Sequence, residues 1–289
     1  MPALELKNLK KHFGGIKAVD GIDLSIEKGE IFGFLGPNGA GKTTTIRCIM
    51  DFIRPTGGKI LVQGKDSIND TVQIKDNIGY LPADISVYGT WTGKEHFDFV
   101  QSTKGKSPLL FDLIRQLDFD PKMQARFLST GNKQKLGLIL TLMSDPEIII
   151  MDEPTKGLDP ILQNEIKKIL VKCKERGRTI FLSSHVLSEV EEICDRVAVI
   201  KQGKIVKMGQ VHELNEMRLH NVHAYFKERP NKNDFEIDNV EITNEIDNSI
   251  LFKVRGDINP LLQKLAKYDL KDIEIAHISL EELFLEFYK

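Results

Sequence analysis

The sequence predicts an α/β fold with a largely parallel sheet, helices on both of its faces, and a second, small α+β domain. Three observations carry this prediction. Short apolar runs such as IFGFL, EIIIM and TIFLSS alternate with helix-like segments, an order typical of parallel strands. A glycine-rich loop, GPNGAGKT, joins the first of these runs to a helix-like segment. Beyond about residue 215 the pattern changes to polar, charged segments between short alternating strands.

The N-terminal third favours short strands and turns. LELKNL alternates between apolar and polar residues, IFGFLG suits a buried strand, and GGKILVQGKD is typical of a hairpin strand. IGYLP is another short strand, and Pro82 ends it. Between them, the segment after the glycine-rich loop has the apolar spacing of a helix, which stops at Pro55.

A compact, all-helical insert is expected between about residues 90 and 143. Thr92 and Glu95 have the spacing of a capping box at its first helix. Leu110, Leu113 and Leu117 recur at the spacing of an apolar helix face. Strand and helix then alternate again up to VAVIKQGKIV, which completes a first domain at residues 1–215.

Residues 220–289 are expected to form the small α+β domain. Its predicted strands are VHAYF, SILFKV and DIEIAHI, and its predicted helices are INPLLQKLAKY and SLEELFLEF. Ser279 and Glu282 have capping-box spacing at the second of these helices. The stretch ERPNKNDFEIDN is polar and contains proline, so it is predicted to be a solvated loop.

Composition excludes several classes of protein. The net charge is −2, so no basic field would hold nucleic acid, and we expect no nucleic-acid partner. The three cysteines have neither disulfide-framework nor zinc-site spacing. No apolar run approaches the length of a membrane span, and the N-terminus lacks the apolar core of a signal peptide. The chain is therefore expected to be soluble and intracellular.

The loop GPNGAGKT matches the phosphate-binding pattern G-x-x-x-x-G-K-[ST] in its required context, after a strand and before a helix. Glycines let backbone N–H groups turn toward phosphate oxygens, and the helix N-terminus adds partial positive charge. Lys42 would contact the β- and γ-phosphates, and the Thr43 hydroxyl would bind Mg²⁺. A chance glycine-rich turn is the alternative. The predicted nucleotide-binding residues here are Gly36, Pro37, Asn38, Gly39, Ala40, Gly41, Lys42, Thr43 and Thr44.

Two adjacent carboxylates, Asp152 and Glu153, end the apolar strand IIIMD. In a parallel sheet this strand end lies beside the phosphate loop. Asp152 is expected to hold Mg²⁺ and Glu153 to orient and deprotonate the attacking water. A strand running into an acidic turn is the alternative, but two carboxylates at a buried strand end are costly without a cation.

A guanine-reading pattern, N-K-x-D, occurs at residues 231–234. It lies in the polar loop, follows no strand of the core sheet, and is therefore rejected as a base-binding motif. The predicted nucleotide is ATP.

The motifs GPNGAGKTT, LSTGNKQK and IIIMDEPTKGLDP occur in this order, and residues 4–215 resemble the nucleotide-binding subunit of ATP-binding cassette (ABC) transporters. The resemblance implies a P-loop cassette with a helical subdomain. It also implies that Ser129 and Gly131 face the γ-phosphate of ATP held by a second subunit. A helix N-terminus at Asn132 and Lys133 would direct its dipole at that phosphate. One site would therefore need two chains, as a homo- or heterodimer.

Further positions match the family. Phe13 aligns with the aromatic residue that stacks on adenine, although a core phenylalanine is the alternative. Asp159 aligns with the loop that couples the two sites. His185 aligns with the switch histidine that contacts the γ-phosphate. Two departures stand out. Ala83 and Asp84 replace the usual glutamine that reaches Mg²⁺, so Asp84 is a candidate substitute ligand. Thr130 and Asn132 replace the usual Gly and Gln of the signature motif.

The resemblance implies an ATPase that uses ATP and Mg²⁺ to power a transmembrane permease on a separate chain, in the exporter-type branch of the family. Closure would reach the permease through the surface between the helical insert and the Ala83–Asp84 loop. The protein would be cytoplasmic, held peripherally at the inner face of the cell membrane. Two alternatives stay open: a non-transport ABC ATPase acting on ribosomes or DNA, and a regulatory module that binds ATP with little turnover.

Overall fold

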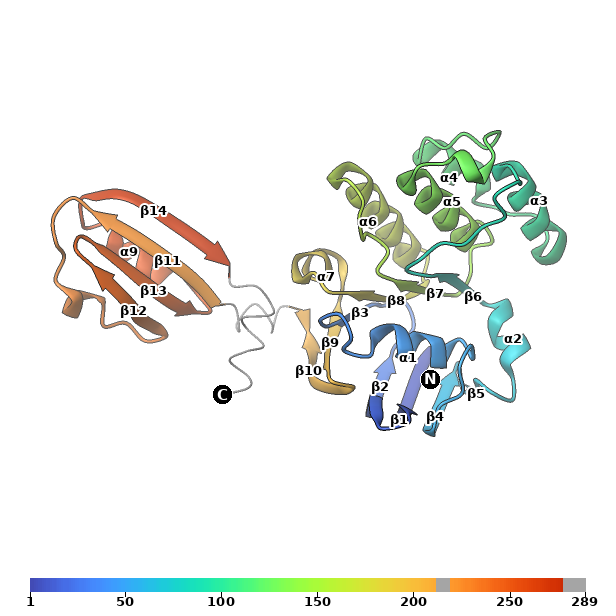
Figure 1. The fold of residues 1–289 in the computed structure, drawn as a ribbon, viewed down its shortest axis with the longest axis horizontal. Coiled ribbons are helices and arrows are strands. Elements are labelled where there is room, and N and C mark those ends of the chain that lie inside the picture. Colours follow the sequence, from blue (N-terminus) through green and yellow to red (C-terminus); the bar gives the residue numbers. More distant parts are fainter. Residues whose placement is uncertain (212–218, 278–289) are drawn as a thin grey trace. The chain divides into compact units, whose positions relative to one another are not determined.

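The computed structural model describes residues 1–211 and 219–277. The chain divides into two compact units, Met1–Met208 and Gly209–Lys289. The larger unit is a layered α/β assembly, and the smaller unit is a sheet with a helix packed on it (Figure 1).

A six-stranded sheet forms the centre of the larger unit. Its neighbouring strands pair in parallel from β6 through β7, β8 and β3 to β9, with β10 at the edge. The strands β3, β7 and β8 are buried along their whole length, which explains their unbroken apolar sequences. The predicted α/β fold with a largely parallel sheet is confirmed. In spatial order the strands are β10 (Lys204–Gln210), β9 (Arg196–Lys201), β3 (Ile31–Leu35), β8 (Thr179–Ser184), β7 (Ile148–Asp152) and β6 (Ile78–Leu81).

A second, antiparallel sheet lies in the same unit, and the sequence did not predict it. Its first two strands are longer than the short strands expected there. Because only residues 14 and 15 separate them, they form a hairpin, which forces antiparallel pairing. In spatial order the strands are β2 (Ile16–Ile26), β1 (Leu4–Phe13), β4 (Gly57–Val62) and β5 (Lys65–Asp66).

Helices cover the central sheet on both faces. Helix α1 (Lys42–Ile49) lies between the two sheets, where its Ile46 and Ile49 join a core shared with β1, β2 and β3 (Figure 1). Helices α6 (Pro160–Glu175) and α7 (Leu187–Ile193) pack on the opposite face of the central sheet. A short helix, α2 (Thr71–Asp76), precedes β6.

The helical insert contains α3 (Gly93–Lys104), α4 (Leu110–Gln116), a 3-10 turn η1 (Ala125–Phe127) and α5 (Thr130–Leu142). The predicted capping box is confirmed, since Thr92 Oγ1 accepts the Glu95 N–H and the Glu95 carboxylate accepts the Thr92 N–H. The expected helix start at Asn132 was wrong. Helix α5 begins two residues earlier because the Ser129 hydroxyl caps it by accepting the Asn132 N–H.

The smaller unit contains an antiparallel sheet and the helix α9 (Asn259–Leu265). The loop predicted to be solvated contains a 3-10 turn, η2 (Lys232–Phe235), whose Phe235 is buried in the core of this unit. Because charged residues surround Phe235 in the sequence, the pattern did not indicate that this side chain is buried. The predicted helix SLEELFLEF, with Ser279 and Glu282, lies outside the described residues. The strands, in spatial order, are β12 (Val240–Ile246), β13 (Ser249–Arg255), β11 (Leu219–Phe226) and β14 (Leu270–His277).

Candidate nucleotide-binding and hydrolysis site

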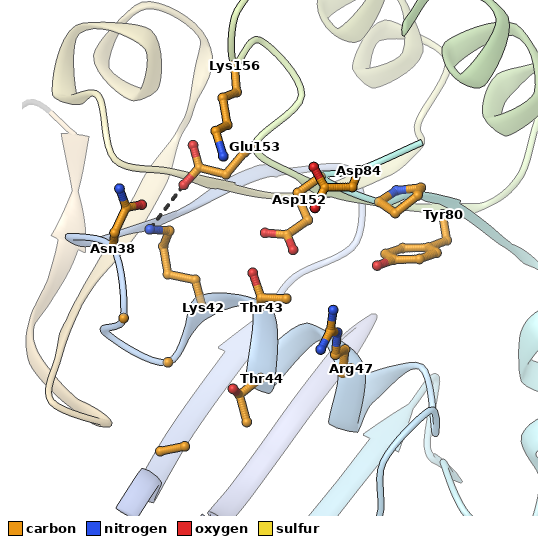
Figure 2. A pocket seen from close by; sticks show the side chains of 15 residues that line it. Asn38, Lys42, Thr43, Thr44, Arg47, Tyr80, Asp84, Asp152, Glu153 and Lys156 are labelled. Carbon is orange, nitrogen blue, oxygen red and sulfur yellow. Dashed lines mark ion pairs between the residues drawn. The ribbon is translucent and has the colours of Figure 1, made fainter. Parts of the chain in front are cut away.

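A cavity of about 310 Å³ opens where α1 begins, beside the C-terminal end of β7. Figure 2 shows the side chains that line it. The residues predicted from the phosphate loop and those predicted from the acidic strand end share this one cavity, although more than 100 residues separate them. The predicted site residues among its lining are Asn38, Gly39, Gly41, Lys42, Thr43, Thr44, Asp84, Asp152 and Glu153.

The phosphate loop needs glycine at two of its positions because other backbone lies against it. A Cβ added to Gly36 would lie 2.3 Å from the carbonyl oxygen of Ile200, and one added to Gly41 would lie 2.4 Å from that of Ala18. Gly41 also has a positive φ of 113°, and it caps α1 at the N-terminus. The loop is therefore fixed between β2 and β9, with the N-terminus of α1 directed into the cavity.

Lys42, the first residue of α1, is 5% exposed. Its Nζ donates to the carbonyl oxygens of Gly36 at 2.7 Å and Pro37 at 3.2 Å. It also lies 3.0 Å from Oε1 of Glu153, as an ion pair rather than an aligned hydrogen bond (dashed in Figure 2). The ammonium group thus lies between the phosphate loop and the candidate base.

Glu153 is 8% exposed, and its backbone has a positive φ of 51°, an uncommon conformation for this residue type. The backbone is held there by Ser183, whose carbonyl oxygen and hydroxyl oxygen both accept the Glu153 N–H, at 3.2 and 3.1 Å. His185 Nδ1 lies 2.6 Å from Glu153 Oε2. One carboxylate is therefore oriented between an ammonium group and an imidazole, an arrangement suited to a fixed general base.

The hydrogen bonds of the Asp152 carboxylate show whether the site fits Mg²⁺. Its Oδ1 accepts the Ser183 hydroxyl at 2.6 Å, while its Oδ2 is buried with no hydrogen-bond partner. Thr43 lines the same cavity, and Figure 2 shows its side chain below Asp152. A hydroxyl and a buried carboxylate oxygen are oxygen ligands of the kind Mg²⁺ takes. Among the described residues, no three His, Cys, Asp or Glu side chains cluster to hold a metal by themselves.

The cavity also contains three charged or polar side chains that sequence reasoning missed: Arg47, Tyr80 and Lys156. Arg47 lies one helical turn beyond Thr43, and this i, i+4 spacing is a signal that was present in the sequence. Burial, and then the charge of Asp152, raise the pKa of the Tyr80 phenol above its usual range. Tyr80 therefore stays a neutral hydroxyl at physiological pH.

Other predicted residues are placed elsewhere. Phe13 is 48% exposed at the end of β1, with Lys11 Nζ 4.8 Å from its ring centroid, and does not line the cavity. Ser129 caps α5 and is exposed, and Gly131 lies in the first turn of that helix. Asp159 caps α6 by accepting the N–H groups of Ile161 and Leu162. Gly36, Pro37 and Ala40 belong to the phosphate loop, and His185 reaches the site through Glu153.

The parallel sheet, the glycine loop at the start of α1 and the paired carboxylates at the end of β7 define a P-loop nucleoside triphosphatase. Comparison with known proteins is more specific. Residues 19–156 match the model of the ABC transporter family. An uncharacterized ABC transporter ATP-binding protein of Bacillus subtilis, YhcH, is 31% identical over 98% of this chain and 95% of its own length. The chain belongs to the family of ABC transporter ATP-binding proteins, which are ATP-hydrolysing cassettes.

Other relatives match over the larger unit. A Nostoc ABC transporter ATP-binding protein is 39% identical over 69% of this chain, which spans 62% of that protein's length. The bacitracin transport ATP-binding protein BcrA of Bacillus licheniformis is 36% identical over 71% of this chain and 68% of its own. A solved ATP-binding subunit of an ABC transporter superposes with a TM-score of 0.69 at 25% identity, covering 74% of this chain and 92% of that one.

The resemblance to ABC cassettes and the prediction of ATP as the nucleotide are confirmed by these comparisons. The N-K-x-D pattern lies in η2 of the smaller unit, outside the cavity that holds the phosphate loop. Within residues 1–211 and 219–277, no helix combines the length and the apolar character needed to cross a membrane.

Proposed function

We propose that this chain hydrolyses Mg²⁺-ATP in a site completed by a second cassette, and that the cycle of closure and reopening powers a separate membrane permease, in the direction of export. The observation that carries this proposal is Glu153, a buried carboxylate oriented by Lys42 and His185 over a phosphate loop. Glu153 acts as the base toward water. Lys42 and the loop residues 36–44 bind the phosphates, and Thr43 and Asp152 hold the metal ion.

The second cassette supplies Ser129 and Gly131. Both lie at the N-terminus of α5, outside the cavity formed by their own phosphate loop, and Ser129 is exposed. An exposed helix N-terminus suits a phosphate group presented by another chain. Asp159, at the start of α6, borders the same dimer interface in this proposal, His185 contacts the γ-phosphate, and Phe13 stacks on adenine.

The permease is proposed to dock between the helical insert and the segment that follows β6. A second cavity, of about 340 Å³, lies there with apolar residues in its lining, including Ile85, Val87, Val100 and Leu140. Its lining includes Pro82, which also lines the nucleotide cavity, so one segment contacts both sites. Such a shared segment suits the transmission of closure to a membrane partner, and would hold the chain at the inner face of the membrane.

Export is proposed because two relatives are named for antibiotics, the bacitracin transport protein BcrA and the linearmycin resistance protein LnrL, and resistance suits removal of a compound from the cell. The cassette of this proposal comprises residues 1–215, with its helical subdomain at about 90–143, and residues 220–289 form an accessory domain. The division between compact units after Met208 supports this arrangement. Purification of the tagged full chain from its own cells tests the partner. Recovery of a multi-span membrane protein is expected, whereas recovery of ribosomes without one would contradict a transport role.

Asp84 is proposed as a metal ligand in place of the usual glutamine. Its side chain lines the nucleotide cavity, on the side where Figure 2 shows Asp152. We expect Asp84→Ala to raise the Mg²⁺ concentration for half-maximal ATPase activity by about tenfold, the lower end of the effect of losing a supporting metal contact. Titration of ATPase rate against Mg²⁺ measures this. Asp112→Ala, on the exposed surface of α4, is the matched control; an unchanged Mg²⁺ dependence for Asp84→Ala would exclude the ligand role.

A further inference from the structure

Two buried or half-buried amide side chains hold the segment that follows the candidate base. Gln134 of α5 is 8% exposed, and its Nε2 donates to the carbonyl oxygen of Pro154 at 2.8 Å. Gln163 of α6 donates to the carbonyl oxygens of Leu158 at 3.0 Å and Thr155 at 3.4 Å. The segment between β7 and α6 is therefore tied separately to two helices.

The bond from Gln134 has a particular position in the site. Pro154 is covalently next to Glu153, so the bond ends one residue from the candidate base. At its other end, Gln134 lies five residues along α5 from Ser129, which caps the same helix. A helix of this length is stiff, and five residues span only about 7.5 Å. A single helix therefore links the exposed Ser129 to the backbone that follows Glu153.

In the proposed dimer, these two ends belong to different nucleotide sites. Ser129 faces the phosphate held by the partner chain, whereas Glu153 acts on the nucleotide held by its own chain. We infer that Gln134 is a positioning residue that couples the two ATP sites, by transmitting displacement of α5 at one site to Glu153 at the other. This inference rests on the proposed two-chain site.

The hydrogen bond from Gln134 to Pro154 is buried, which suits it to coupling the two ATP sites. Water has little access to either partner, so breaking the bond would leave the Pro154 carbonyl oxygen unsatisfied. Helix α5 and Pro154 are therefore expected to move together when the dimer closes. Gln163 makes similar bonds to the same segment, but it holds Leu158, next to the interface residue Asp159. The control is therefore Gln63, whose Nε2 donates to the Glu147 side chain outside the nucleotide cavity.

The test compares Gln134→Met with Gln63→Met in the full chain. Methionine keeps the length of the side chain and removes the donor. We expect the Hill coefficient of ATP hydrolysis to fall from about two, the number of sites, toward one in Gln134→Met, with kcat lowered about tenfold. ATP binding by the isolated chain should keep the parent Kd. Gln63→Met should retain the cooperativity.

Three results would overturn the inference. Parent cooperativity and kcat in Gln134→Met would show that the bond carries no coupling. Equal loss of cooperativity in Gln63→Met would show that the effect does not depend on the bond to Pro154. A parent protein that hydrolyses ATP without cooperativity would exclude coupling while leaving the proposed ATPase function intact; absence of hydrolysis would instead contradict that function. If Gln134→Met does not fold, Gln134→Asn, which is one methylene shorter and cannot reach Pro154, replaces it.

Discussion

Replacement of Glu153 by glutamine is expected to lower kcat for ATP hydrolysis by about 100-fold to 10,000-fold, the range typical of removing a general base. Glutamine keeps the shape of the side chain but cannot accept the proton of the attacking water. The contacts that hold the backbone, from Ser183 to the Glu153 N–H, do not involve the carboxylate and should survive. Single-turnover and steady-state phosphate release measure the change.

Binding of ATP by the Glu153→Gln variant should remain within a few-fold of the parent, because the phosphate loop is unaltered and Lys42 keeps its bonds to the carbonyl oxygens of Gly36 and Pro37. The loss would therefore appear in kcat rather than in Kd. Glu147→Gln is the matched control, since Glu147 lies just before β7 and bonds to the Gln63 side chain outside the cavity. If Glu153→Gln hydrolysed ATP at the parent rate, Glu153 would not be the base.

Lys42→Met is expected to act first on ATP binding. The change removes the buried ammonium that lies against Gly36, Pro37 and Glu153. In the proposed function this cation contacts the phosphates, so the Kd for ATP should rise by about 30-fold or more, equivalent to roughly 2 kcal/mol. Titration with a fluorescent ATP analogue measures the Kd, and turnover should fall with it.

The matched control for Lys42→Met is Lys94→Met, an exposed lysine on α3 that pairs with Asp98. That variant should bind and hydrolyse ATP as the parent does. Lys42→Met leaves the buried Glu153 carboxylate without its ion-pair partner, which can destabilise the fold. A thermal melt of the variant therefore distinguishes a loss of ATP binding from a loss of folding. Parent-like ATP affinity in a folded Lys42→Met chain would contradict the role of the lysine.

The sequence predicted the central sheet because its strands are buried on both faces and therefore apolar without interruption, as in β7. It did not predict the antiparallel sheet, because the alternation in LELKNL is compatible with either strand direction. The two residues after Phe13 were not predicted to be a hairpin turn. Phe235 was missed because one apolar residue among charges gives no periodic signal, although the residue is buried.

For the site, motif spacing brought Lys42, Asp152 and Glu153 together correctly in one cavity. The sequence could not predict the contacts that these three side chains make, because the contacts depend on the direction in which each side chain points. The Glu153 side chain points between Lys42 and His185 through a positive φ, and no pattern of residue types specifies that conformation. The Gln134 bond to Pro154 likewise joins two segments whose packing only the fold determines.

The central claim is that one ATP site needs two chains, and the mass of the Glu153→Gln variant in solution tests it most directly. Light scattering on the full chain is expected to show a monomer without nucleotide and a dimer with Mg²⁺-ATP, because hydrolysis no longer reopens the closed state. Adding Ser129→Ala to the same chain should return it to a monomer while ATP binding is retained. A chain that binds ATP yet forms no dimer, either with its own copy or with a cassette recovered from its cells, would contradict the account, as would a dimer unaffected by Ser129→Ala.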